Sequence, residues 1–247
     1  MSKRLPARGT SNPASSTAGV APTRTSTPVP SARRASPPAS RPALSRARIV
    51  DAAAALVDRE GAEALSARRL AGELGCEAMS LYHHVPNMGE LLDAVVDQAL
   101  GALPLPEADT AAPGAALRAM TDAYLGLAGM RPHTFRVLAT HRWRTPAEIA
   151  YQSRLIELLV HVGHAPRAAL RASRVLLVYL NGGGLAIAIW AQDMRHVSVE
   201  RTTPVVRKLM KFSTAPAVAR DVRSGLTLLL EALLPASRAS ARQRGAR

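Results

Sequence analysis

The chain has 247 residues, 47% of them hydrophobic, and carries a formal net charge of +14. This hydrophobic content supports one large or two small domains with a buried core. The single cysteine, Cys76, excludes an internal disulfide, no Cys/His cluster has zinc-ligand spacing, and no uncharged apolar run reaches the roughly 18 residues that span a bilayer.

The positive charge is concentrated at the two ends of the chain. Residues 1–48 contain nine Lys/Arg and no acid, residues 236–247 contain four Arg and no acid, and residues 49–235 keep a net charge of +1. We expect a disordered basic arm at 1–43 and a disordered basic tail at 236–247. The arm is either a contact to DNA phosphates or a solvated leader. Because no apolar signal core follows the basic start, we expect a soluble cytoplasmic protein without a membrane span.

Two helices are predicted first. Ser45 is an N-cap for a helix whose apolar residues recur at helical spacing, and Gly61 ends it. Ser66 caps a short second helix, and Gly75 ends that helix in the left-handed conformation that glycine tolerates best. This close succession of starts and stops is typical of a helix-turn-helix.

A third helix is predicted over about 77–83, with Leu81 turned inward. Asn87 caps a fourth helix, with Glu90 as the reciprocal partner, and Gly101 ends it. The outward face of the third helix holds no acid after its first residue and combines apolar and hydrogen-bonding groups, which suits contact with base edges in a major groove. Its residues are Ala78, Met79, Ser80, Tyr82 and His83.

Three motifs follow one another here: R-I-V-D-A-A-A-x-L from Arg48, G-x-E-A-L-S-A-R-R-L-A-x-E-L-G from Gly61, and M-S-L-Y-H-H-V-x-N-x-x-E-L-L-D-A-V from Met79. In order and spacing they resemble the N-terminal DNA-binding domain of the tetracycline-repressor (TetR) family. The resemblance implies an all-α fold, with a DNA-binding domain at 44–95 and a helical ligand-binding and dimerisation domain at 96–235.

The resemblance also implies site residues. Positions that touch bases in the tetracycline-responsive members correspond to Arg68, Ala78, Met79, Ser80 and Tyr82, and His84 lies near the DNA backbone. Tyr82 either contacts a base or packs on the first helix with only its hydroxyl at a phosphate, and His84 is equally a candidate core or capping histidine.

One departure from the family concerns phosphate contacts. The family usually has a lysine just after the position of Asn87, where this chain has Met88. Residues 44–95 hold five basic residues against eight acidic ones, so affinity is expected to depend on a few cations and on the arm. These cations are Arg46, Arg48, Arg68 and Arg69.

The second half also reads as helical, since no strand-like alternation between hairpin turns occurs in it. After a loop near 104–113, one face collects Leu117, Met120, Tyr124 and Leu127. Thr145, Pro146 and Glu148 form an N-cap, first-turn proline and capping box, and Gly163 stops that helix.

An apolar segment at 165–191 contains Asn181 and three consecutive glycines, Gly182, Gly183 and Gly184. Arginines inside it favour a doubly buried helix over a membrane span. The glycines, each costing ~1 kcal/mol in a helix, predict a kink or a close approach at a pocket or interface. With the last helix, about 217–234, this segment presents more apolar surface than a monomer covers. The resemblance implies a four-helix dimer interface and an inducer pocket.

Polar and aromatic residues near these apolar helices are candidate ligand contacts: His133, His141, Arg142, Trp143, Tyr151, Tyr179, Asn181 and Trp190. No metal or cofactor is assigned. Phosphate-binding and catalytic motifs are absent from the sequence, which argues against an enzyme. We expect a homodimeric regulator, in most cases a repressor, that binds palindromic double-stranded DNA and is released by a small-molecule inducer. The alternatives are a helical dimer that binds ligands or scaffolds partners without DNA, or an enzyme.

Overall fold

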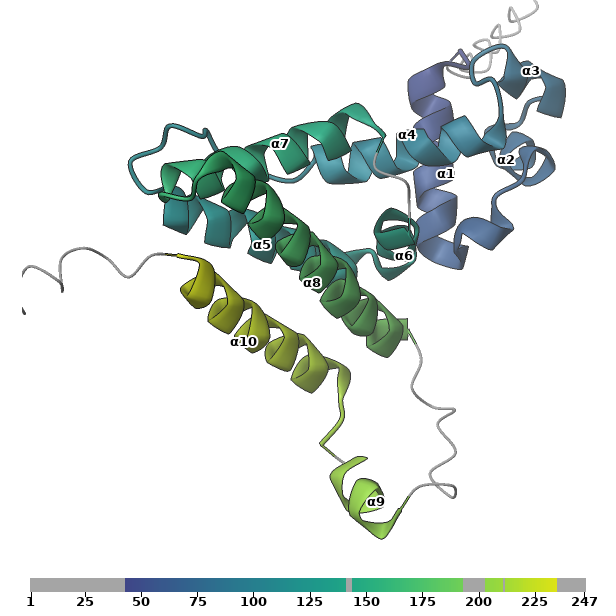
Figure 1. The fold of residues 1–247 in the computed structure, drawn as a ribbon. Helices are drawn as coiled ribbons and strands as arrows, with labels where there is room; N and C mark the ends of the chain where they lie inside the picture. Colours follow the sequence, from purple (N-terminus) through teal and green to yellow (C-terminus); the bar gives the residue numbers. More distant parts are fainter. Residues whose placement is uncertain (1–42, 141–143, 193–202, 211, 235–247) are drawn as a thin grey trace, which may run out of the picture. The chain divides into compact units, whose positions relative to one another are not determined.

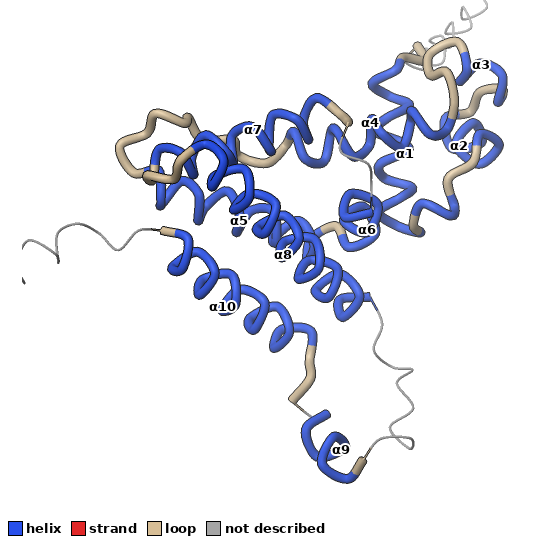
Figure 2. Tube along the Cα trace, viewed as in Figure 1, coloured by secondary structure: helices blue, strands red, loops and turns tan. Residues whose placement is uncertain are grey.

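The computed structural model describes residues 43–140, 144–192, 203–210 and 212–234, and every regular element in these ranges is helical (Figures 1 and 2). The all-α prediction is therefore confirmed. The elements are α1 (Arg46–Glu60), the 3₁₀ turn η1 (Ala62–Ala64), α2 (Ala67–Leu74), α3 (Ala78–Tyr82), α4 (Met88–Gly101), α5 (Pro113–Met130), α6 (Pro132–Thr140), α7 (Pro146–His161), α8 (Pro166–Gln192), α9 (Pro204–Met210) and α10 (Ala215–Leu233). Apart from Ala43, the predicted arm and the predicted basic tail lie outside the described residues.

The predicted boundaries of the first two helices are confirmed. The Ser45 side chain accepts a hydrogen bond from the Arg48 backbone N–H at the start of α1, and Gly61 ends the helix with φ of 90°. The Ser66 hydroxyl caps α2 in the same way, and Gly75 has left-handed φ and ψ of 66° and 38°. A residue with a side chain is strained at such a φ, so glycine permits the tight turn between α2 and α3.

The next two helices differ slightly from the prediction. Helix α3 is shorter than expected, because Glu77 and His83 are its caps rather than its first and last residues. The Asn87 side chain accepts from the Glu90 backbone N–H at 2.8 Å, which confirms the N-cap of α4. Only this half of the predicted capping box is present, whereas at α7 both halves form between Thr145 and Glu148.

Buried side chains form two hydrophobic cores, and α4 contributes to both. Leu91 and Val95 of α4 pack into the first core with residues of α1, α2 and α3. Val96 and Leu100, further along α4, pack into the second core with α5, α6, α7, α8 and α10. Since one rigid helix is shared, a displacement of the second core against the first has to act on α4.

Aromatic rings fill the centre of the second core. Tyr124 and Phe135 meet edge to face with centroids 5.3 Å apart, and the Tyr151 ring lies at the same centroid distance from Tyr124 with a tilted orientation. The four apolar residues predicted to share one face of α5 are all buried. The helical pattern of the sequence therefore predicted the interior face of α5 correctly.

Helix α8 continues without interruption through its three glycines, and the predicted close approach is present at two of them. A Cβ on Gly184 would lie 2.1 Å from the Phe135 ring, and one on Gly183 would lie 2.6 Å from Val222 of α10. A Cβ on Gly182 would meet nothing within 4 Å. By length and composition α8 also passes as a membrane span, but it packs against α5, α6, α7 and α10. Two of the glycines thus serve packing inside the chain.

Candidate nucleic-acid interface

The outward face of α3 is held in place by one buried residue. Leu81 is fully buried in the first core, and Val85, just beyond the helix, is almost so. Met79 and Tyr82 point away from the core, with 70% and 41% of their surfaces exposed. Of the other predicted contacts, His83 is exposed, and Ala78, Ser80 and His84 are partly exposed. The short helix therefore presents the predicted face to the outside on a fixed support.

The hydroxyl of Tyr82 is available for a contact. Among the residues that the structure describes it makes no hydrogen bond, and 41% of the Tyr82 surface is exposed. Phenol hydroxyls donate to phosphates and to base edges alike. Both predicted arrangements, contact with a base and packing on α1 with the hydroxyl at a phosphate, therefore stay open.

Arginines near α2 fall into two groups. Arg69 is ion-paired with Glu60, and Arg59 with Glu73 at 2.5 Å, so both guanidinium groups already have a carboxylate. Arg68, next to Arg69 in sequence, is exposed and forms no ion pair within the described ranges. Of the cations on α2, Arg68 is the one with an unneutralised charge.

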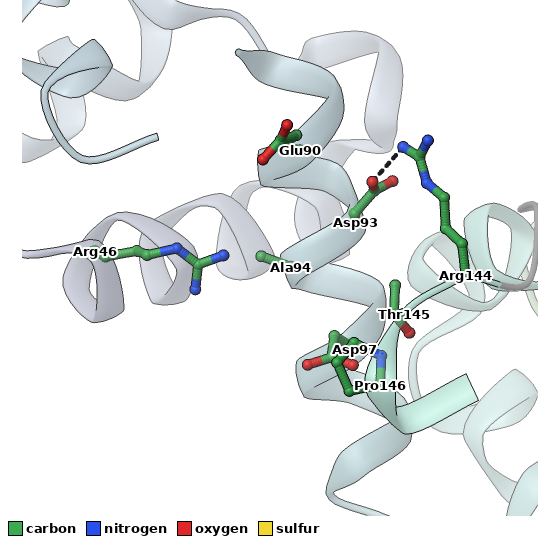
Figure 3. Close-up of a pocket in the computed structure, with 8 residues that line it drawn as sticks. All are labelled: Arg46, Glu90, Asp93, Ala94, Asp97, Arg144, Thr145 and Pro146. Atoms are coloured by element: carbon green, nitrogen blue, oxygen red, sulfur yellow. Dashed lines mark hydrogen bonds and ion pairs between the residues drawn. The ribbon is translucent and has the colours of Figure 1, made fainter. Parts of the chain in front are cut away.

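The two arginines at the start of α1 are placed differently. The Arg48 guanidinium donates to the Ala43 carbonyl at 2.9 Å, so it is already engaged with the chain. Arg46 is exposed and lies beside a polar pocket of about 480 Å³ between α1, α4 and the start of α7 (Figure 3). Carboxylates of Glu90, Asp93 and Asp97 line this pocket too. Arg46 therefore shares this pocket with three carboxylates.

Carboxylates of that pocket tie α4 to the start of α7. Asp93 is ion-paired with Arg144, as the dashed line in Figure 3 marks. Asp97 accepts a hydrogen bond from the Ala147 backbone N–H at 2.8 Å, in the first turn of α7, where a negative charge is favourable. These contacts join α4, which contributes to both cores, to the start of α7.

A second junction links α1 to α6. Asp58 accepts from Arg131 Nε at 2.7 Å and from the buried Thr134 hydroxyl at 2.5 Å. Sequence reasoning missed these residues, because they are 73 and 76 positions apart and no local pattern connects them.

Met88 stands at the position where a lysine was expected, and it is a packing residue. Its side chain is partly buried and packs against the first core. The side chain at this position thus contributes to packing of the first core and carries no charge.

The candidate ligand residues do not converge on one pocket. Tyr151 donates to the Met120 carbonyl at 3.1 Å, and Tyr179 to the Val222 carbonyl at 2.7 Å. Asn181 accepts from the Tyr124 hydroxyl at 2.7 Å, a partner that sequence reasoning had assigned only to the core. Burial raises the pKa of the Tyr124 and Tyr151 phenols. These groups join helices of the second core.

The remaining candidates are scattered. His133 lines a second pocket, beside α6, and Trp190 is partly buried near the end of α8. His141, Arg142 and Trp143 lie outside the described residues. In the described ranges no group of three or more His, Cys, Asp or Glu side chains is placed to hold a metal ion.

Comparison with known proteins connects this geometry to a family. Residues 49–95 match the family model described as bacterial regulatory proteins, tetR family. Over 58 residues the chain is 52% identical to the HTH-type transcriptional repressor DrrR1 of Streptomyces coeruleorubidus, covering 24% of this chain and 22% of the relative. Over 161 residues it is 30% identical to an HTH-type transcriptional regulator of Saccharopolyspora erythraea, covering 61% and 64%. The chain thus spans less than two thirds of the length of these relatives.

A solved structure extends the similarity beyond the matched domain. The chain resembles the TetR family protein ActR of Streptomyces coelicolor in complex with (S)-DNPA, with a TM-score of 0.62 and 26% identity. The alignment covers 78% of this chain and 98% of ActR. The helical body therefore follows the family architecture as well as the N-terminal helices. Residues 49–95 thus carry the domain of the tetR family of bacterial regulatory proteins, and the fold of the described chain is similar to that of a solved TetR family protein.

Proposed function

We propose that this chain is a cytoplasmic, homodimeric transcriptional repressor that binds a palindromic operator and is released by a small molecule bound in the helical body. One observation carries the DNA-binding part: α3 presents an acid-free face of mixed chemistry on a buried anchor, next to the unneutralised Arg68. Such a helix fits the major groove of B-DNA.

The residues of this surface have distinct roles. Arg68 has the planar guanidinium that pairs with O6 and N7 of guanine. Ser80 and Tyr82 supply hydroxyls, and Ala78 and Met79 supply apolar contact for thymine methyl groups. His83 and His84, which follow α3, and Arg46 and Arg48, at the start of α1, are assigned to contacts with the phosphate backbone.

The spacing of major grooves in DNA and the exposed apolar side chains of α8 and α10 both support a dimer. One short helix reads only a few base pairs, whereas two that lie ~34 Å apart read a palindrome in successive major grooves. Val175 and Val178 of α8 and Leu228 of α10 expose 51%, 75% and 68% of their surfaces on two helices that pack together. A face of this kind supports a four-helix contact with a second copy.

Release by a ligand requires coupling between the two cores. Helix α4 belongs to both, and Asp97 and Asp93 tie it to α7 and to Arg144. A ligand that favours one arrangement of the body thereby favours one orientation of α4 and of α3. It weakens DNA binding by the difference between its affinities for the two arrangements.

Operator binding tests the proposal directly. The purified chain is titrated onto labelled DNA that contains the palindrome nearest to its own gene, and onto scrambled DNA of equal length, at ~0.15 M salt. We expect at least a hundredfold preference for the palindrome and a stoichiometry of two chains per site. Equal affinity for the two DNAs would refute sequence-specific regulation, and binding of one chain per site would refute the dimer.

A further inference from the structure

A pocket of about 410 Å³ lies where the DNA-binding part of the chain meets the helical body. Glu63 of η1 and Leu92 of α4 line it from one side, and His133, Arg136 and Val137 of α6 and Ile189 of α8 from the other. Its volume is within the range of pockets for small organic ligands, roughly 300 to 1,000 Å³. This pocket differs from the polar one between α4 and α7, with which it shares no lining residue.

One end of the pocket is built around a glycine. Gly61 is buried with φ of 90°, and a Cβ there would lie 2.8 Å from a Glu63 carboxylate oxygen and 3.2 Å from Nδ1 of His133. The carboxylate and the imidazole therefore converge on the same point, although they form no ion pair with each other. Hydrogen-bonding capacity is left available at this end of the pocket.

The other features are a cation and an apolar wall. Arg136 is exposed, has no carboxylate partner within the described ranges, and makes only a 3.5 Å hydrogen bond to Gln192. Leu92, Val137 and Ile189 supply apolar surface, and half of the Ile189 surface is exposed. A cation without a counterion beside exposed apolar surface is complementary to an amphipathic anion.

We propose that this pocket binds an aromatic molecule with one anionic group, and that its occupation lowers the affinity for DNA. The anion pairs with Arg136, the ring lies on the apolar wall, and a hydroxyl or carbonyl of the ligand reaches His133 and Glu63. Because the walls come from both parts of the chain, the bound molecule sets the position of η1 and α4 relative to α6 and α8. The regulatory half of this inference rests on the proposed function.

Two fluorescent probes of the same shape test the binding site. 1-Anilinonaphthalene-8-sulfonate carries a sulfonate, and N-phenyl-1-naphthylamine is its uncharged counterpart. Both are titrated into the full dimeric chain. We expect the sulfonate to bind at least tenfold more tightly than the amine, because a charge-assisted hydrogen bond contributes more than a neutral contact.

Variants locate the probes. Arg136→Gln is expected to weaken sulfonate binding about tenfold and to leave amine binding unchanged. Ile189→Trp fills the pocket and is expected to weaken both probes. Arg118→Gln on α5 is the control, since it removes one cation outside the pocket. Circular dichroism and size-exclusion chromatography verify fold and dimer for each variant. Equal probe affinities for wild type and both pocket variants would overturn the site.

The regulatory half has a separate readout. Saturating sulfonate is expected to raise the Kd for operator DNA at least fivefold in the wild type and not in Arg136→Gln. If the wild type binds operator and the sulfonate binds the pocket without changing that Kd, the coupling is refuted and the site remains. If operator binding itself is absent, the proposed function fails, while the probe titrations still decide whether the site exists.

Discussion

Arg68 and Arg69 are adjacent arginines with opposite expected roles, which makes them a matched pair for testing the DNA interface. Arg69 is ion-paired with Glu60, whereas Arg68 is exposed and has no ion pair in the described part of the chain. A bidentate contact between arginine and guanine contributes about 1 to 3 kcal/mol of discrimination. Arg68→Ala is therefore expected to raise the Kd for operator about 10- to 100-fold and to relax specificity at one base pair of each half-site.

Arg69→Ala is expected to behave differently. Its loss leaves Glu60 with only the longer, 4.0 Å ion pair to Arg59, so operator and scrambled DNA are both expected to bind slightly less well, with a ratio of affinities close to that of the wild type. The exposed ion pair contributes at most about 1 kcal/mol to folding, so stability is nearly unchanged. Fluorescence anisotropy with both DNAs at three salt concentrations measures these effects. An equal loss of specificity in the two variants would refute the assignment of base contact to Arg68.

Further predictions concern the body and its junction. Gly184→Ala places a methyl group against Phe135 and is expected to lower the free energy of unfolding, measured in urea titrations, by about 1 to 3 kcal/mol. Gly182→Ala places a methyl group in open space and is expected to raise the free energy of unfolding by up to ~1 kcal/mol. Equal effects of the two substitutions would contradict the packing argument. Asp58→Asn weakens the α1 to α6 junction and is expected to cost about 1 to 2 kcal/mol by the same measurement, with Asp122→Asn, an exposed carboxylate, as the neutral control. Burial raises the pKa of the Tyr124 phenol in the folded state above its unfolded value, so its contribution to the free energy of unfolding is complete below about pH 10 and falls as pH rises further. Tyr124→Phe is expected to reduce this loss of stability at alkaline pH. The same pH dependence of unfolding in wild type and variant would contradict the reasoning.

Much of the candidate interface was predictable because its signals are local. The caps at Ser45, Ser66 and Asn87 and the left-handed Gly75 each act over a few residues, so the sequence defines them without tertiary information. The outward face of α3 follows from the position of Leu81 and from helical periodicity. DNA contact by these residues stays a prediction.

The body was predictable only as a set of helices. The pattern on α5 identified buried residues, but not that the Tyr124 hydroxyl binds Asn181, 57 positions away. Three consecutive glycines indicated close packing somewhere, and only the structure shows Phe135 at Gly184, Val222 at Gly183 and open space at Gly182. A periodic pattern specifies which face of a helix is buried and does not specify the side chain that covers it.

The sequence by itself determined the all-α class, the helix-turn-helix and the family resemblance, because caps, glycine turns and periodicity are encoded within a few residues of one another. Tertiary structure alone decided which charges are neutralised and which residues share a pocket. Arg68 and Arg69 are adjacent in the sequence, yet of the two only Arg69 pairs with Glu60. Leu92, Arg136 and Ile189 lie far apart along the chain and line one cavity, because electrostatic and packing partners are chosen by proximity in space.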